Sequence, residues 1–155
     1  MEARRRVLGP EDAQTVANMG NLAISYRKLG RNQEGLKLEE QVLEVQRRIL
    51  GPEDPDTLRT MSYLAQSYHI VGRKQEALEL GQQALEMQKR VLGDEHPDTL
   101  FSIRKQLHIL RGLGMTEQLR DLLQATLPVH EKVLGAEHPS MVRLRNKFRT
   151  EVVSL

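Results

Sequence analysis

The chain has 155 residues, which is within the range of one domain, and its 23 Lys and Arg residues nearly balance 21 Asp and Glu residues. It contains no Cys, which excludes disulfide bonds, thiolate metal sites and a thiol nucleophile. No apolar run is long enough to span a membrane, and no apolar stretch follows the basic N-terminal residues as it would in a signal peptide. We therefore expect a cytoplasmic protein without a membrane partner.

One phrase recurs along the chain and organises it. Residues 50–58 (LGPEDPDTL) return as residues 92–100 (LGDEHPDTL), and looser copies begin at Leu8 and Leu134. The copies start at intervals of 42 residues, and a fixed period of this kind is typical of stacked-repeat proteins. Gly after Leu suits the left-handed end of a helix, and Pro followed by Asp and Thr suits the first turn of the next. The phrase is thus predicted to connect helices, and its charged residues to serve structure.

The predicted elements follow this period in chain order. Residues 2–8 align with 44–50, so we expect the last turns of a repeat whose beginning is missing, and a chain that starts inside a longer array. Three repeats are predicted over 12–50, 54–92 and 96–134, each with two helices joined by a turn at a glycine. Residues 139–153 are predicted to form one helix that covers the apolar end of the stack, as terminal repeats must.

The apolar residues of each repeat are spaced as on one face of a helix. Met19, Leu22, Ala23 and Tyr26 in the first repeat correspond to Met61, Leu64, Ala65 and Tyr68 in the second. Such spacing predicts amphipathic helices, and no alternation typical of strands occurs. Aliphatic residues recur at equivalent positions while the surface residues vary, which indicates a packing interface that is repeated along the chain.

These residues resemble a tetratricopeptide repeat. Asn21-Leu22-Ala23 with Tyr26 and Gly30 matches the family's pattern, and Leu64-Ala65 with Tyr68 and Gly72 matches it more closely. The usual unit has 34 residues. The longer unit here resembles the kinesin light chain subclass, which is also common in tandem at the C-termini of NB-ARC and NACHT signalling ATPases. The resemblance implies an all-α fold, a right-handed α-α superhelix of three tetratricopeptide helix pairs plus a C-terminal capping helix, as one domain over residues 1–155.

The chain departs from the family pattern in its second helices. Glu39, Gly81 and Leu123 stand where the family often has an aromatic residue, so looser packing is expected there. Pro128 lies inside the predicted second helix of the third repeat, where it removes a hydrogen bond and should bend the helix.

The third repeat also exchanges a pair of small residues for a pair of large ones. Ala23 faces Gly35 and Ala65 faces Ala77 in the predicted helix pairs, but both equivalents in the third repeat are Leu, at positions 107 and 119. Because both members change together, we expect a wider helix pair rather than a packing defect.

Catalytic and metal-binding patterns are missing from the sequence. His96 and His138 lie in connectors, and the other three His residues form no helical ligand pair. No Gly-rich phosphate loop and no activated nucleophile is present. We therefore predict no enzyme activity, no metal and no cofactor.

Binding is the better hypothesis, because the resemblance implies that the first helices line a concave groove. The register places a largely basic set of residues there, with Asn21 at a position where this subclass often bonds a peptide backbone. A cleft of one charge sign attracts ligands of the opposite sign. The sequence thus favours protein–protein interaction with an acidic peptide segment. The predicted groove residues are Asn21, Arg27, Arg59, Tyr63, His69, Arg104, Lys105, His108 and Arg111.

Three alternatives remain open at this point. A solvated basic face needs no dedicated partner at all. Nucleic acid would also suit the cations, although single-strand binders interleave aromatic residues and this groove offers only Tyr63 and Phe101. Finally, exposed repeat ends could make the chain a structural or oligomerisation module of a larger signalling protein, with self-association through those ends.

Overall fold

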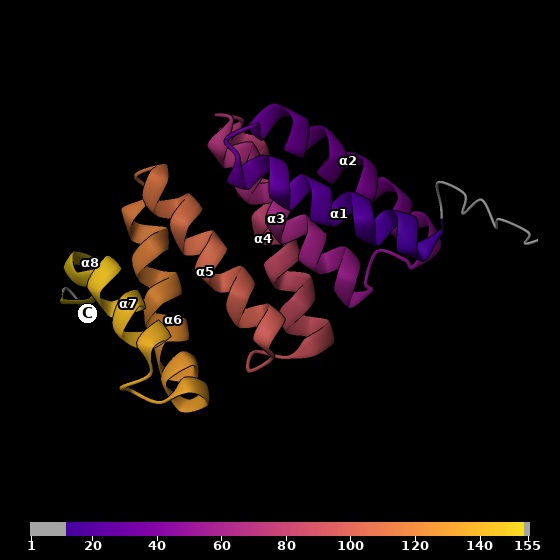
Figure 1. Ribbon diagram of the computed structural model, residues 1–155. Coiled ribbons are helices and arrows are strands. Elements are labelled where there is room, and N and C mark those ends of the chain that lie inside the picture. The colour runs from indigo at the N-terminus through magenta and orange to yellow at the C-terminus, as the bar shows by residue number, and fades with distance from the viewer. Residues whose placement is uncertain (1–11, 154–155) are drawn as a thin grey trace, which may run out of the picture.

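The computed structural model describes residues 12–153, and the predicted repeat tail at residues 2–8 lies outside this range. Within it the chain forms helices and no strands. Three helix pairs follow one another from one end of the molecule to the other, and two short helices close the array (Figure 1). The elements are α1 (Ala13–Lys28), α2 (Asn32–Ile49), α3 (Pro55–Ile70), α4 (Lys74–Leu92), α5 (Pro97–Gly112), α6 (Thr116–Leu134), α7 (Pro139–Lys147) and α8 (Arg149–Val153).

The recurring phrase forms the connectors between helix pairs, as predicted. Gly93 and Gly135 end α4 and α6 with φ of 90° and 85°, a conformation that residues with a Cβ rarely adopt. A proline then occupies the first turn of α3, α5 and α7, where no N–H donor is needed. His96 caps α5 because its Nδ1 accepts a hydrogen bond from the Asp98 backbone N–H at 3.1 Å. The connector histidines therefore have a structural role.

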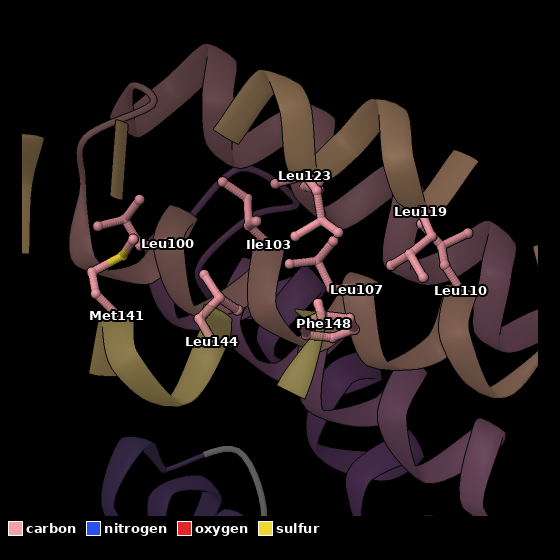
Figure 2. Close-up of a cluster of buried hydrophobic side chains, with 10 residues drawn as sticks. Leu100, Ile103, Leu107, Leu110, Leu119, Leu123, Met141, Leu144 and Phe148 are labelled. Carbon is pink, nitrogen blue, oxygen red and sulfur yellow. The ribbon is translucent and has the colours of Figure 1, made fainter. Parts of the chain in front are cut away.

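Each helix packs against its neighbours in the chain, so the core is distributed along the stack. One apolar cluster joins α2, α3 and α4, and another joins α5, α6, α7 and Phe148. The small-residue contact is observed in the first pair, because a Cβ added at Gly35 would lie 3.0 Å from the Ala23 carbonyl oxygen. In the third pair Leu107 and Leu119 are both buried in the same cluster (Figure 2). The larger pair thus fills the space between α5 and α6.

The single helix predicted over residues 139–153 is wrong in one respect. The helix is interrupted at Phe148, whose φ of −113° and ψ of 31° leave the helical range. Phe148 is fully buried in the cluster of the third pair (Figure 2), and α8 then packs against α6. Burial of this large ring outweighs the helical hydrogen bonds that the interruption costs. Helix α6 runs through Pro128 without ending, so the expected bend at that residue stays a prediction.

Candidate functional site

The side chains of the first helices touch one another from pair to pair. The Arg27 guanidinium of α1 lies 4.9 Å from the centre of the Tyr63 ring of α3. That ring lies 5.0 Å from the ring of Phe101 on α5. We call the surface formed by the nine predicted groove residues and Phe101 on α1, α3 and α5 the first-helix surface. The contacts just described link its three helices.

A hollow of about 330 Å³ opens at the first-pair end of this surface. It lies between α1, α2 and α3, and its walls include Val16, Ile24 and Val42. Three predicted groove residues line it, namely Asn21, Arg59 and Tyr63. Asn21 is exposed, so its amide is available to a ligand. The hollow combines apolar walls with a few polar groups, as small binding sites generally do.

Sequence reasoning missed a buried carboxylate in this hollow. Glu39 of α2 is only 4% exposed and lines the hollow. Burial raises the pKa of Glu39, while the Ser67 hydroxyl and the Arg27 guanidinium act in the opposite direction. The Arg27 Nη1 atom lies 3.7 Å from the Glu39 Oε1 atom. Part of the positive charge predicted at this end is therefore balanced from within the chain.

Arg59 is also paired, because its guanidinium contacts the Asp56 carboxylate one helical turn away. The cations of α5 differ from Arg27 and Arg59. Among the described residues, Arg104, Lys105 and Arg111 have no carboxylate partner. The sequence predicted basic groove residues on all three first helices, and in the structure the cations without a carboxylate partner lie on α5.

Lys105 lies near the centre of this charge. Its Nζ donates a hydrogen bond to the Gln66 Oε1 atom at 2.7 Å and lies 4.9 Å from the centre of the Phe101 ring. Burial lowers the pKa of Lys105 to about 8, and repulsion from Arg27, Arg104 and Lys147 adds to the effect. Burial also lowers the pKa of Arg104. The ammonium group is thus held at a place where an anion would stabilise it.

Two further cations near these side chains, Arg143 and Lys147, lie on α7, which sequence reasoning did not place in the groove. Repulsion from Lys147 acts on Lys105 and His108, and repulsion from Arg143 acts on Arg104. Their arrival depends on how α7 packs, which no local signal in the sequence indicates. We use the term α5 cationic cluster for the set Arg104, Lys105, Arg111, Arg143 and Lys147.

Two predicted groove residues of α5, Arg111 and His108, contact the segment that closes the array. Arg111 donates a hydrogen bond from Nη1 to the Lys147 carbonyl oxygen at 2.7 Å, and its guanidinium lies 5.5 Å from the centre of the Phe148 ring. His108 lies with its ring 5.7 Å from the Phe148 ring. Burial, with repulsion from Lys147 and other cations, lowers the pKa of His108 to about 4. His108 is therefore neutral at pH 7 and contributes no charge to the site.

His69 has a packing role in addition to its place on α3. A Cβ added at Gly112 would lie 2.4 Å from the His69 Nε2 atom, so the imidazole lies directly against the end of α5. The nine predicted residues therefore separate into groups. Three line the hollow, three belong to the α5 cationic cluster, Arg27 links the two regions, and His69 and His108 pack against neighbouring elements.

No group of three or more His, Asp and Glu residues within 12–153 is placed to hold a metal ion. None of the helices there combines the length and apolar character that crossing a membrane requires.

Comparisons with known proteins agree with the observed geometry. A family model for the tetratricopeptide repeat matches residues 14–90. No curated protein matches the chain. A crystal structure of the Podosopora anserina putative kinesin light chain with nearly identical TPR-like repeats is 30% identical, with a TM-score of 0.78. The match covers 94% of this chain and 69% of that chain.

Two further solved structures extend the comparison. A single-substitution variant of the Podosopora anserina protein gives a TM-score of 0.80 at the same identity and coverage. BtubC (BKLC) from P. vanneervenii is 15% identical with a TM-score of 0.72, over 83% of this chain and 50% of that chain, which shows likeness of fold alone. The repeat period, the helix pairs and these matches show that the chain belongs to the tetratricopeptide repeat family, with repeats like those of kinesin light chains.

Proposed function

We propose that the first-helix surface binds an extended, acidic segment of a partner protein. Tetratricopeptide repeats generally mediate protein–protein interaction, and the family is generally not enzymatic. The observation that carries the proposal is the α5 cationic cluster, in which Arg104, Lys105 and Arg111 have no carboxylate partner among the described residues. A carboxylate of the partner would supply the missing charge and form charge-assisted hydrogen bonds with the guanidinium groups.

The hollow gives the bound segment a direction. Its apolar walls suit one apolar side chain of the segment, and we expect the amide of Asn21, which lines the hollow, to bond the segment's backbone. Arg27 and Arg59 already face carboxylates of this chain, so this end offers less unbalanced positive charge to a carboxylate of the segment. The proposed ligand therefore carries an apolar residue toward α1 and acidic residues toward α5 and α7.

Isothermal titration calorimetry with a panel of peptides tests this function. An extended peptide with one Leu followed by several Glu residues is compared with neutral and basic peptides of the same length and with a single-stranded oligonucleotide. We expect the acidic peptide to bind most tightly, with an affinity that falls as salt rises because exposed charges are screened over about 10 Å at 0.1 M. Preference for the oligonucleotide, or equal binding of all peptides, would refute the proposal.

Charge reversal supplies the matched control. Arg104→Glu with Arg111→Glu should weaken the acidic peptide strongly without changing helicity. Arg47→Glu with Lys89→Glu makes the same change in net charge on second helices and should do little. A bound carboxylate also raises the pKa of Lys105 from about 8, so binding at pH 8 to 9 should take up a proton from the buffer.

Nucleic acid is a weaker second candidate. Base stacking needs aromatic faces, and the two aromatic rings of the first-helix surface, Tyr63 and Phe101, already pack against each other at 5.0 Å. Arg104 and Lys105 also lie over the Phe101 ring. The cations could still contact phosphates, which is why the oligonucleotide belongs in the panel.

A further inference from the structure

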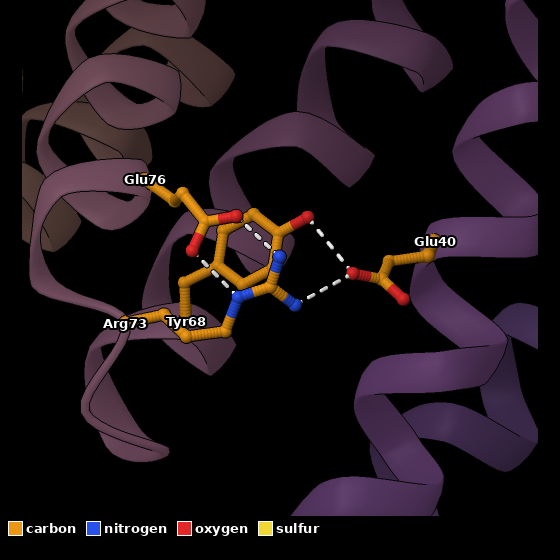
Figure 3. Close-up of polar contacts among 4 residues, drawn as sticks. All are labelled: Glu40, Tyr68, Arg73 and Glu76. Atoms are coloured by element: carbon orange, nitrogen blue, oxygen red, sulfur yellow. Dashed lines mark hydrogen bonds and ion pairs between the residues drawn. The ribbon is translucent and has the colours of Figure 1, made fainter.

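Several cations of this chain are held between carboxylates. Arg73 is the clearest case, because its Nη1 donates a hydrogen bond to the Glu40 Oε1 atom at 2.9 Å and its Nε donates to Glu76 at 2.6 Å (Figure 3). The Tyr68 hydroxyl donates to the same Glu40 oxygen at 3.0 Å. Pairing with Glu76, and then with Glu40, raises the pKa of Arg73 above its usual range. The charged form of this side chain is thus stabilised.

The surroundings of Lys105 on α5 are of the opposite kind. In the part of the chain that the structure describes, no carboxylate pairs with its ammonium. The charged groups that act on it there are Arg27 of α1, Arg104 of α5 and Lys147 of α7, and all three are positive. Its one hydrogen bond runs from Nζ to the Gln66 Oε1 atom at 2.7 Å. Three helices therefore place cations around one amine.

The amine is partly withdrawn from water but still accessible. The rings of Phe101 and Tyr63 have their centres 4.9 Å and 5.7 Å from Nζ, and Lys105 is neither fully buried nor fully exposed. Burial and repulsion from the three cations lower its pKa to about 8, so about half of the amine is neutral at pH 8. The ordinary pKa of 10.5 would leave about one amine in 300 neutral. His108, on the next turn of α5, is neutral at this pH.

A neutral lysine amine is a nucleophile that adds to carbon dioxide. The nitrogen lone pair forms a bond to the carbon, one C=O electron pair moves onto oxygen, and the nitrogen loses one proton to solvent. The product is a carbamate, so the side chain changes from one positive to one negative charge. The three cations that repel the ammonium attract this carboxylate, and guanidinium groups form charge-assisted hydrogen bonds with it. The remaining N–H can still donate to Gln66.

We propose that Lys105 is a site of reversible carboxylation by carbon dioxide, with the carbamate stabilised by Arg27, Arg104 and Lys147. The modification supplies from within the chain the carboxylate that the α5 cationic cluster lacks. An acyl group on the same nitrogen would give a neutral amide, which these cations would not stabilise in this way. The chemistry of the surroundings thus favours carbon dioxide over acyl donors.

Chemical trapping in the intact chain tests the modification. The protein is equilibrated with carbon-13-labelled bicarbonate and carbon dioxide at pH 8, carbamates are ethylated with triethyloxonium, and peptide mass spectrometry locates the label. Lys89 is the matched control, because its Nζ lies 4.0 Å from an Asp94 carboxylate oxygen. We expect at least about tenfold more label on Lys105 than on Lys89, because its amine is neutral far more often than an ordinary one. Equal labelling, or a bicarbonate signal without label on Lys105, would overturn the proposal.

Two variants test the role of the surrounding cations. Lys105→Gln should remove the carbamate signal of this site from the carbon-13 spectrum. Arg104→Gln keeps the amine but removes one of the cations, so it should lower the labelling of Lys105 several-fold, with circular dichroism to verify the fold. Arg47→Gln makes the same change on an exposed position of α2 and should have no effect. Unchanged labelling in Arg104→Gln would contradict stabilisation by the cluster.

The consequence for ligand binding rests on the proposed function. At equal ionic strength, bicarbonate in place of chloride should weaken binding of the acidic Leu–Glu peptide at least about threefold, because a negative charge replaces a positive one. Lys105→Gln should abolish this difference, and an equal loss in that variant would refute control through this amine. Because trapping uses no peptide, a failure of acidic-peptide binding and a failure of carbamate formation are observed separately.

Discussion

The two equivalent leucines Leu22 and Leu64 allow a matched test of packing. Leu64→Ala removes a side chain that is 2% exposed in an apolar cluster, so it should cost about 2–5 kcal/mol of the free energy of unfolding. Leu22→Ala makes the same chemical change at the same place in the repeat, but the side chain is 45% exposed. With no closed cavity and about half of the transfer free energy at stake, the cost should be about 0.5–1 kcal/mol.

Urea denaturation followed by circular dichroism measures both values in the same buffer. Helix propensity cancels, since each variant replaces Leu by Ala inside a first helix. We therefore expect a difference of about 1 kcal/mol or more between the two variants. If Leu22→Ala cost as much as Leu64→Ala, the outward face of α1 would be covered in solution, and the reasoning from exposed and buried equivalents would fail.

Three other predictions concern the core, the pH dependence of stability and the contact of Glu40 with Tyr68 and Arg73. Leu107→Ala should cost about 2–5 kcal/mol and Ala65→Leu about 1–3 kcal/mol by denaturation, and a neutral Ala65→Leu would contradict the close contact of α3 with α4. Folding lowers the pKa of His108 from 6.5 to about 4, so the free energy of unfolding keeps its full value above pH 6.5 and falls as the pH drops toward 4. His108→Gln should make the free energy of unfolding less dependent on pH over that window. An unchanged pH dependence would refute the burial of His108. Where Glu40 of α2 contacts Tyr68 and Arg73, Glu40→Gln and Arg73→Ala should show a favourable coupling in a double-mutant cycle, and no coupling would contradict the role of this contact in fixing the register of α2 on α3.

Much of the fold could be predicted because its signals are local. Gly93 and His96 mark a helix end and a helix start within a few residues of each other, and the 42-residue period repeats those marks along the chain. The interruption at Phe148 could not be predicted, because it depends on the burial of one ring against another helix pair. Helical spacing of apolar residues continues through that position and gives no sign of it.

The candidate site was less accessible to sequence reasoning. The register predicted Asn21, Tyr63 and Lys105 on the groove side of the first helices. In the structure Asn21 and Tyr63 line the hollow, and Lys105 lies among other cations. It did not show that Glu39 of α2 reaches Arg27 of α1, or that α7 brings Lys147 toward Lys105 of α5. Both contacts join different helices and depend on how those helices pack. Charge balance in a groove depends on such contacts and not on the residues of the first helices alone.

The most direct test of the central claim is a map of where an acidic peptide binds. Titration of the isotope-labelled chain with the Leu–Glu peptide, followed by amide chemical shifts, reports every helix at once. The account predicts saturable shifts on α1, α3 and α5, largest around Arg104 and Lys105, with little change on the outward residues of α2 and α4. Shifts confined to the second helices, or none at peptide concentrations in large excess, would contradict the claim that the first-helix surface is the binding site.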